Sequence, residues 1–175
     1  DYPGNIFRFV QKEFSALERQ GTLLALVSKN NLVDVDEVLC SHPDMVLKES
    51  QIVAKKVNWS DKPSNLRALA KELNVGLDSF VFLDDSSFEC DAVRQQLPMV
   101  RVFQVPATLS EYPKVVAEIK SLFLAGGISA SSKGKTEQYR QRAGAEGLKA
   151  QFKTHEEYLG SLELKVELTR NDRAN

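Results

Sequence analysis

Two unbroken apolar runs constrain the fold of this chain more than any other feature of its sequence. Leu23 to Val27 and Ser79 to Leu83 show no alternation of apolar and polar residues, which is expected of parallel strands covered on both faces. A third run, Val100 to Val105, follows the second. Segments with helical spacing separate these runs, and strands that alternate with helices predict an α/β fold, with a parallel sheet flanked by helices and right-handed crossovers.

The segments between the runs predict helices from their apolar spacing. Pro63 suits the first turn of one helix, where its missing N–H is harmless, and Asn74 with Gly76 closes that helix. Met45 to Leu47 predicts a brief strand. The other expected helices cover residues 5–20, 33–39, 88–97 and about 115–123.

The composition changes after Leu124. Residues 1–124 predict the α/β core, and residues 125–135 are rich in glycine, alanine and serine, as in a linker. Residues 136–175 contain a highly charged helical segment and then an alternating strand pattern from Glu163 to Thr169. This last region predicts the start of a further domain that the printed sequence does not complete.

Composition excludes several classes of protein. The formal net charge is -1, which argues against a nucleic-acid surface. The sequence has no run of 18 apolar residues, so we expect no membrane-spanning helix. The two cysteines, Cys40 and Cys90, lie far apart, so we expect no disulfide framework and a reducing, cytoplasmic location. The motifs of zinc hydrolases, Rossmann dehydrogenases and P-loop enzymes are absent from the sequence.

Polar clusters follow the predicted strands or begin a helix, and ligands of open parallel sheets bind beyond the carboxyl ends of the strands. Two adjacent aspartates suit Mg²⁺, which usually takes one or two carboxylates together with phosphate oxygens. A lysine at a helix start adds positive charge for the same phosphate. The pattern predicts a magnesium-dependent phosphoryl site, with Asp84 and Asp85 as metal ligands, and its candidate residues are Ser28, Lys29, Asn30, Lys62, Asn65, Asp84 and Asp85.

Each cluster taken alone also has a structural interpretation. Adjacent acids after a strand often cap the next helix, a serine after a strand is often a turn residue, and a lysine is often solvated. The functional interpretation rests on the order in which Ser28, Lys62 and Asp84-Asp85 occur, each at the expected end of an element.

Longer motifs around these residues resemble a known family. LLALVSKNN, SHPDMVL, VNWSDKPSNLRALAKELN and LDSFVFLDDSSFE are similar, in this order, to the FkbH-like branch (subfamily IIIC) of the haloacid dehalogenase superfamily. The resemblance runs from about Tyr2 to Tyr112 and resumes in residues 136–167, where TEQYR and SLELKVE look like the segment that leads to the family's carboxy-terminal domain.

The resemblance implies a Rossmann-like domain that works with Mg²⁺. Ser28 matches the second motif, whose hydroxyl binds the transferring phosphoryl group, and Lys62 matches the third motif, whose ammonium steadies its charge. Asp84 and Asp85 match the acidic fourth motif, of which at least one ligates the metal. In polyketide biosynthesis such domains remove phosphate from a glyceryl donor such as 1,3-bisphosphoglycerate. They then load the glyceryl unit onto the phosphopantetheine thiol of an acyl carrier protein.

The sequence departs from the family pattern at two places. The first motif, a central strand ending in an Asp-x-Asp loop with the nucleophile, should precede Tyr2, and Asp1 does not replace it; we therefore expect a trimmed or partial sequence that is inactive as printed. Position 27 is valine, where many glyceryl-transferring relatives carry a candidate thioester cysteine. Two alternatives therefore stay open: a magnesium-dependent phosphatase without acyl transfer, and a non-catalytic docking module.

Overall fold

The computed structural model describes residues 4–124, 138, 139 and 141 of the chain. The chain divides into two units, residues 1–143 and 144–175, and every described residue belongs to the first. The predicted linker and the strand pattern near the carboxyl terminus therefore lie outside the described residues. Of the predicted charged helix, only residues 138, 139 and 141 are described, and they are helical.

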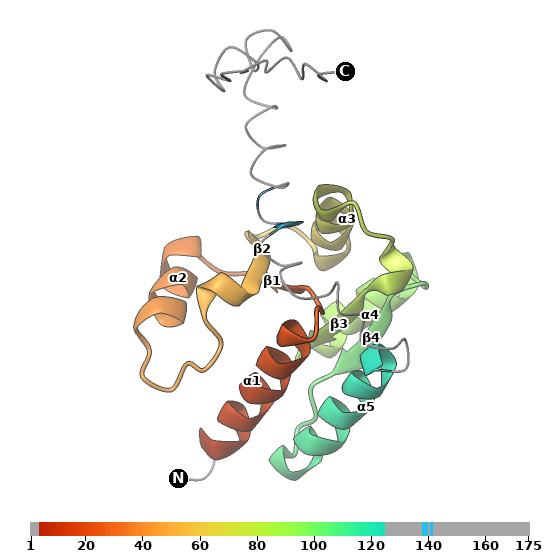
Figure 1. The fold of residues 1–175 in the computed structure, drawn as a ribbon. Coiled ribbons are helices and arrows are strands. Elements are labelled where there is room, and N and C mark those ends of the chain that lie inside the picture. Colours follow the sequence, from red (N-terminus) through yellow and green to blue (C-terminus); the bar gives the residue numbers. More distant parts are fainter. Residues whose placement is uncertain (1–3, 125–137, 140, 142–175) are drawn as a thin grey trace, which may run out of the picture. The chain divides into compact units, whose positions relative to one another are not determined.

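Helices and strands alternate along the described chain (Figure 1). None of the described helices is both long and apolar enough to cross a lipid bilayer. The strands are β1 (Leu24–Ser28), β2 (Ile52–Val57), β3 (Val81–Asp84) and β4 (Arg101–Gln104). The α-helices are α1 (Gly4–Arg19), α2 (Leu32–Ser41), α3 (Lys62–Leu73), α4 (Ser87–Gln96) and α5 (Tyr112–Leu124), and the short 3-10 helices are η1 (Glu49–Gln51), η2 (Leu77–Ser79) and η3 (Leu109–Glu111).

The strands form two parallel pairs. β1 pairs with β2, so that Ser28 lies opposite Val57, and β3 pairs with β4, so that Asp84 lies opposite Gln104. Within the described residues, no backbone hydrogen bond joins one pair to the other. The predicted α/β fold with parallel strands flanked by helices is confirmed, although the strands make two pairs where one sheet was expected.

Two helices build a common core over both strand pairs. α3 packs on β1 and β2, α4 packs on β3 and β4, and the two helices contact each other. Each buried core side chain contributes roughly 1.5–3 kcal/mol through removal from water. The core cluster consists of Val53, Ala54, Leu66, Leu69, Leu73, Phe82, Val93, Leu97 and Val100.

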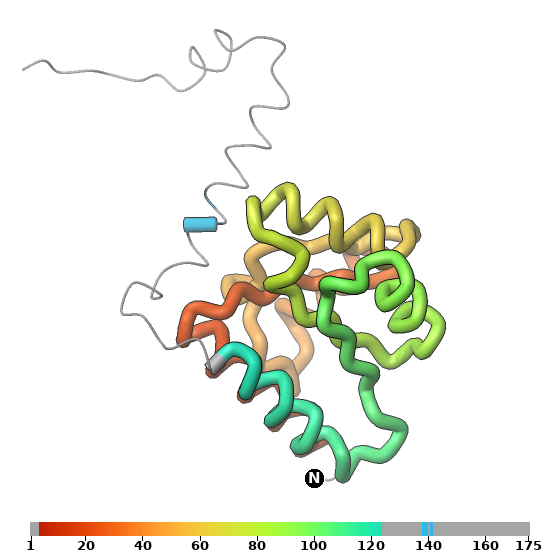
Figure 2. The backbone as a smooth tube through the Cα atoms, turned by 90° about the vertical axis from the view of Figure 1, so that its right-hand side faces the viewer, coloured from red at the N-terminus to blue at the C-terminus, as the bar shows by residue number. Residues whose placement is uncertain are grey.

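The other long helices, α1 and α5, lie side by side although the rest of the described core separates them in sequence (Figures 1 and 2). The rings of Phe7 and Tyr112 meet edge to face, with centroids 5.9 Å apart and an interplanar angle of 79°. Glu13 on α1 forms an ion pair with Lys120 on α5. An apolar contact and a charged one therefore fix this helix pair at two levels.

The predicted strand at Met45 to Leu47 is wrong, because this segment is irregular and the strand lies at β2 instead. β2 was hidden by Lys55 and Lys56, whose charges are half-buried and paired with acids of neighbouring elements. The expectation that β1 is covered on both faces is also wrong. Its residues are half-buried and Ala25 is exposed, because β1 has a hydrogen-bonded strand on one side only among the described residues.

Candidate functional site

The start of α3 is fixed by a cap that directs Lys62 inward. The Ser64 backbone N–H donates to the Asp61 carboxylate at 2.8 Å, and this hydrogen bond holds the pKa of Asp61 below its ordinary value. Pro63 occupies the first turn, as its fixed backbone angle favours. Lys62 begins the helix with only 5% of its surface exposed, so its ammonium group lies within the protein.

The Lys62 ammonium joins the ends of β1 and β3 through contacts with Val27 and Asp84. Its Nζ donates to the Val27 carbonyl oxygen at 2.8 Å and lies 3.2 Å from Asp84 Oδ2. The two charged side chains are only 7% and 12% exposed. Burial of a charge is costly unless it is paired and hydrogen-bonded, so this ion pair holds both groups in place between the two strand pairs.

Asp84 is also tied to the start of α4. Its Oδ1 accepts the Ser86 backbone N–H at 3.0 Å, and Ser86 Oγ accepts the Glu89 backbone N–H at 3.3 Å. The N-cap of α4 is therefore Ser86, and the interpretation of the adjacent aspartates as helix caps is wrong. Asp85 is exposed, and its carboxylate makes no hydrogen bond or ion pair with any other described side chain.

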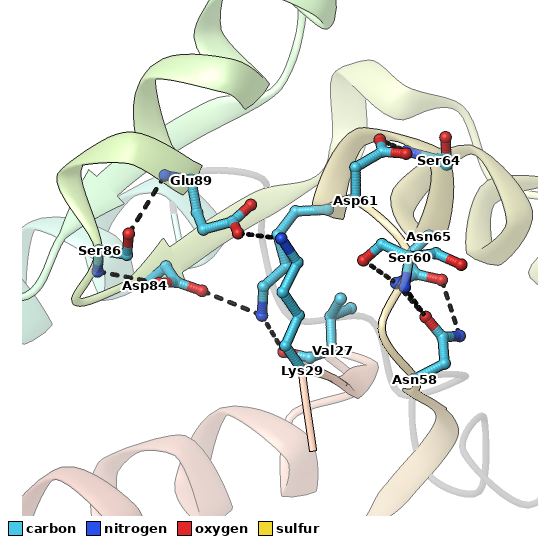
Figure 3. Close-up of polar contacts among 11 residues, drawn as sticks. Val27, Lys29, Asn58, Ser60, Asp61, Ser64, Asn65, Asp84, Ser86 and Glu89 are labelled. Carbon is cyan, nitrogen blue, oxygen red and sulfur yellow. Dashed lines mark hydrogen bonds and ion pairs between the residues drawn. The ribbon is translucent and has the colours of Figure 1, made fainter. Parts of the chain in front are cut away.

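A second ion pair crosses between the strand pairs at the same end of the strands. Lys29 Nζ, just beyond β1, lies 2.5 Å from Glu89 Oε1 in the first turn of α4 (Figure 3). The Glu89 side chain is 10% exposed and that of Lys29 is 35% exposed. Sequence reasoning missed Glu89, because a glutamate on an amphipathic helix resembles a solvated residue. Its only signal was a position one turn beyond the strand-ending acids.

Ser28 and the two asparagines take different positions around these charges. Ser28 ends β1 half-buried, and its backbone carbonyl accepts the Asn58 N–H at 3.0 Å. Asn65 is buried and exchanges two amide hydrogen bonds with Asn58, at 2.9 and 3.1 Å. Asn30 is exposed, and its side chain accepts the Asn31 N–H. The amide of Asn65 therefore stabilises the loop before α3, while a phosphate contact by either asparagine stays a prediction.

The acidic residues at the strand ends are candidate magnesium ligands by their chemistry. Among the residues that the structure describes, no group of three or more histidine, cysteine, aspartate or glutamate side chains is placed to hold a metal. Mg²⁺ needs only one or two carboxylates when water and phosphate oxygens complete its shell. Each Asp84 oxygen keeps a further lone pair beside its present partner, and Asp85 has both oxygens open. The two aspartates have the donor chemistry of a partial magnesium shell, and their ligation of the metal stays a prediction.

Comparison with known proteins gave a solved structure that is similar to this chain. No protein-family model and no curated protein matches. The similar structure is the crystal structure of the N-terminal part of the protein BF1531 from Bacteroides fragilis, containing a phosphatase domain complexed with Mg. The identity is 36% and the TM-score 0.62, and the match covers 64% of this chain.

The match covers 30% of the BF1531 chain, so this chain spans less than a third of that protein's length. The mixed α/β fold agrees with a Rossmann-like fold of the haloacid dehalogenase type. This agreement supports the superfamily to which the sequence motifs point, and it does not distinguish the FkbH-like branch within it. By fold and by sequence, the chain is similar to part of a solved chain that contains a phosphatase domain complexed with Mg.

Proposed function

We propose that this chain forms the phosphoryl-binding core of a magnesium-dependent phosphatase of the haloacid dehalogenase type. The observation that carries the proposal is the buried Lys62 ammonium, held between the Val27 carbonyl and the Asp84 carboxylate. The magnesium-bound phosphatase domain of BF1531, at 36% identity, supports it. A buried cation beside strand-ending acids is the arrangement that a dianionic phosphate ester and a divalent metal require.

The residues of the site divide the work of binding a phosphate ester. Lys62 offers fixed positive charge to the phosphoryl oxygens, and the Ser28 hydroxyl donates a hydrogen bond to one of them. Lys29, more exposed at the mouth of the site, meets the substrate from the solvent side. Asp84 and Asp85 hold the metal, and Mg²⁺ neutralises charge on the phosphoryl group when it is bound.

The reaction also needs a nucleophile. Residues 1–23 contain no Asp-x-Asp sequence that could supply it. In the proposed chemistry, a carboxylate oxygen bonds to phosphorus as the substrate alcohol leaves, and water then hydrolyses the aspartyl phosphate to inorganic phosphate. A strand that carries such a carboxylate would fit between β1 and β3. The missing backbone hydrogen bonds between the described strand pairs and the exposed Ala25 support this position.

The test is magnesium-dependent hydrolysis of p-nitrophenyl phosphate by a form of the protein that also carries an Asp-x-Asp strand, because the printed sequence lacks that nucleophile. We expect turnover with Mg²⁺, its loss in EDTA, and a fall in kcat/KM of at least ~100-fold for Lys62→Met, because a fixed charge at the phosphoryl group is removed. Lys71→Met, an exposed lysine of the same helix, is the matched control. The non-catalytic docking module predicts no turnover and indifference to Lys62→Met, and that result would overturn the proposal.

The narrower proposal is that the phosphoryl donor is a glyceryl phosphate and that the acceptor is an acyl carrier protein. The resemblance of the SKNN, NWSDKPSN and FLDDSSFE segments to FkbH-like domains supports it. Val27 weighs against acyl transfer, because its side chain cannot form a thioester. We expect 1,3-bisphosphoglycerate and a phosphopantetheinylated carrier to give the glyceryl thioester by mass spectrometry. Phosphate release without a mass gain on the carrier removes the transfer and leaves the phosphatase.

A further inference from the structure

We propose that Glu89 is a positioning residue that holds the Ser28 loop, residues 28–30, in its working geometry. The inference rests on the proposed phosphatase function, because it gives Ser28 a role in binding the phosphoryl group. Glu89 was not among the residues that the motifs singled out. Two observations point to a role for Glu89: its ion pair with Lys29 and the low exposure of its side chain.

The contacts on either side of Ser28 close into a ring. Val27, on one side of Ser28, accepts the Lys62 ammonium at its carbonyl oxygen, and Lys62 pairs with Asp84. Asp84 accepts the Ser86 N–H, and Ser86 caps the Glu89 N–H. Glu89 then pairs with Lys29, on the other side of Ser28. Both neighbours of Ser28 are therefore anchored to the β3–α4 connection.

Glu89 supplies the half of this ring that Lys62 does not reach. Lys62 restrains the backbone before Ser28 through the Val27 carbonyl, whereas the residue after Ser28 is restrained through its side chain by Glu89. Without Glu89, the loop beyond β1 loses its ion pair to α4. Because a displacement of about 1 Å is enough to cost on the order of 100-fold in rate, this restraint matters for chemistry at Ser28.

The burial of Glu89 makes the contact durable. Glu89 lies in the first turn of α4, where the helix dipole favours a negative charge. Its carboxylate is mostly removed from solvent, so separation from Lys29 would leave a desolvated and unpaired charge. Lys29 keeps about a third of its side chain exposed. A phosphate ester is therefore able to meet the Lys29 ammonium while Glu89 still holds it from the other side.

The experiment compares Glu89→Gln with Asp91→Asn. Asp91 lies two residues further along α4 and pairs with Arg94 in an exposed contact at 2.8 Å, so it controls for the loss of one helix carboxylate. Amide hydrogen exchange at residues 28–30 reports the loop, and kcat and KM for p-nitrophenyl phosphate with Mg²⁺, measured on the form that carries the Asp-x-Asp strand, report the chemistry. The melting temperature of each variant is measured as well, so that a local change in the loop is distinguished from a loss of global stability.

We expect Glu89→Gln to raise exchange at residues 28–30 by about tenfold, as expected when a local restraint is lost. We expect kcat to fall by about tenfold or more with KM changed less than about threefold, because the variant removes alignment and not a substrate contact. Asp91→Asn should leave all three quantities unchanged. The double variant Lys29→Gln/Glu89→Gln should exchange no faster than the faster single variant, since both changes remove one contact.

Two outcomes separate this inference from the function on which it rests. If the unaltered protein hydrolyses the ester and Glu89→Gln keeps both its kcat and its loop exchange, Glu89 has no positioning role. If the unaltered protein shows no turnover at all, the proposed phosphatase fails, while the exchange measurement still decides whether Glu89 holds the loop. Should Glu89→Gln unfold the protein, Lys29→Gln, at the more exposed partner, tests the same contact by exchange.

Discussion

Two groups of lysine–carboxylate pairs in this molecule have the same chemistry and different surroundings. The first group lies at the carboxyl ends of β1 and β3, where Lys62 and Asp84 are 7% and 12% exposed. The second lies beside β2, where Lys55 pairs with Asp36 and Glu49 at 2.6 and 2.7 Å. Both acids of the second group are more than a third exposed. Distance alone does not separate the groups, but burial does.

The difference teaches what a charged residue near a strand end is able to do. Water screens the Lys55 pairs, so that either partner can be lost and the other is solvated. The Lys62 and Asp84 side chains are largely removed from water, so loss of one partner leaves the other as an unpaired buried charge. A charge held away from water also acts more strongly on a bound phosphate. The buried group therefore suits binding and catalysis, and the exposed group suits the fixing of α2 and η1 against β2.

The largest effect that separates the groups is expected for Lys62→Met compared with Lys55→Met. Lys62→Met leaves the Asp84 carboxylate without its counter-ion, and we expect it to lower the free energy of unfolding by ~3–5 kcal/mol. Lys55→Met should lower it much less, because Asp36 and Glu49 face solvent. Urea denaturation of both variants measures the difference. Equal losses of stability would show that burial does not divide the groups.

A second comparison uses the cysteines, since each group of pairs has one cysteine beside it. Cys40 is exposed near Glu49, while Cys90 is fully buried against the carbonyl oxygens of Asp84 and Phe103. Burial, with the Asp84 charge adding to it, raises the pKa of the Cys90 thiol. Because the thiolate is the reactive form, we expect iodoacetamide to modify Cys90 about 100-fold or more slowly than Cys40, in proportion to its rare opening.

Peptide mass mapping at increasing times of alkylation measures both rates in one sample. Denaturation in urea is the control, because it should make the two rates similar. Fast modification of Cys90 in the folded protein would mean that the β3–α4 connection opens readily, contrary to the fixed geometry that the site requires.

The sequence was sufficient to predict the strand-ending acids but not how their neighbours are arranged. β1 and β3 are continuous apolar runs, so their carboxyl ends and the residues beyond them were found directly. β2 was missed, because its second half carries two lysines and only the structure shows the acids that neutralise them. Periodicity reports apolar burial, and it does not reveal half-buried lysines that acids of other elements neutralise.

The same limit explains Glu89 and Asn65. Glu89 was overlooked because its partner, Lys29, is 60 residues away and no local pattern joins them. Asn65 was predicted to contact phosphate from its place near Lys62, yet its amide exchanges hydrogen bonds with Asn58. In both cases the residue type and spacing were visible and the tertiary contact was not, and a phosphate contact by Asn65 stays a prediction.

The smallest effect concerns pH at the exposed group. The hydrogen bond and charge of Lys55 hold the pKa of Glu49 below its ordinary 4.5, against burial and the Asp36 charge. Hydrogen bonds to Asp36 and Glu49 raise the pKa of Lys55 above its ordinary 10.5. An acid whose pKa is lowered on folding stabilises the fold at pH values above its pKa in the unfolded chain. This contribution is lost as the pH falls through its pKa in the folded protein. A lysine whose pKa is raised on folding stabilises the fold at pH values below its pKa in the unfolded chain. This contribution is lost as the pH rises through its pKa in the folded protein.

We therefore expect Glu49→Gln to lower the melting temperature by a small amount that is constant from about pH 6 to pH 9 and shrinks as the pH falls through the lowered pKa of Glu49, because the native carboxylate is then protonated as well. Thermal unfolding of both proteins across this range measures the difference. Added salt should shrink it, because the pair is exposed and ions screen it. A difference that does not shrink in acid, or that resists salt, would show that Glu49 stabilises the fold by something other than its charge, and the distinction between the two groups of pairs would then need another cause.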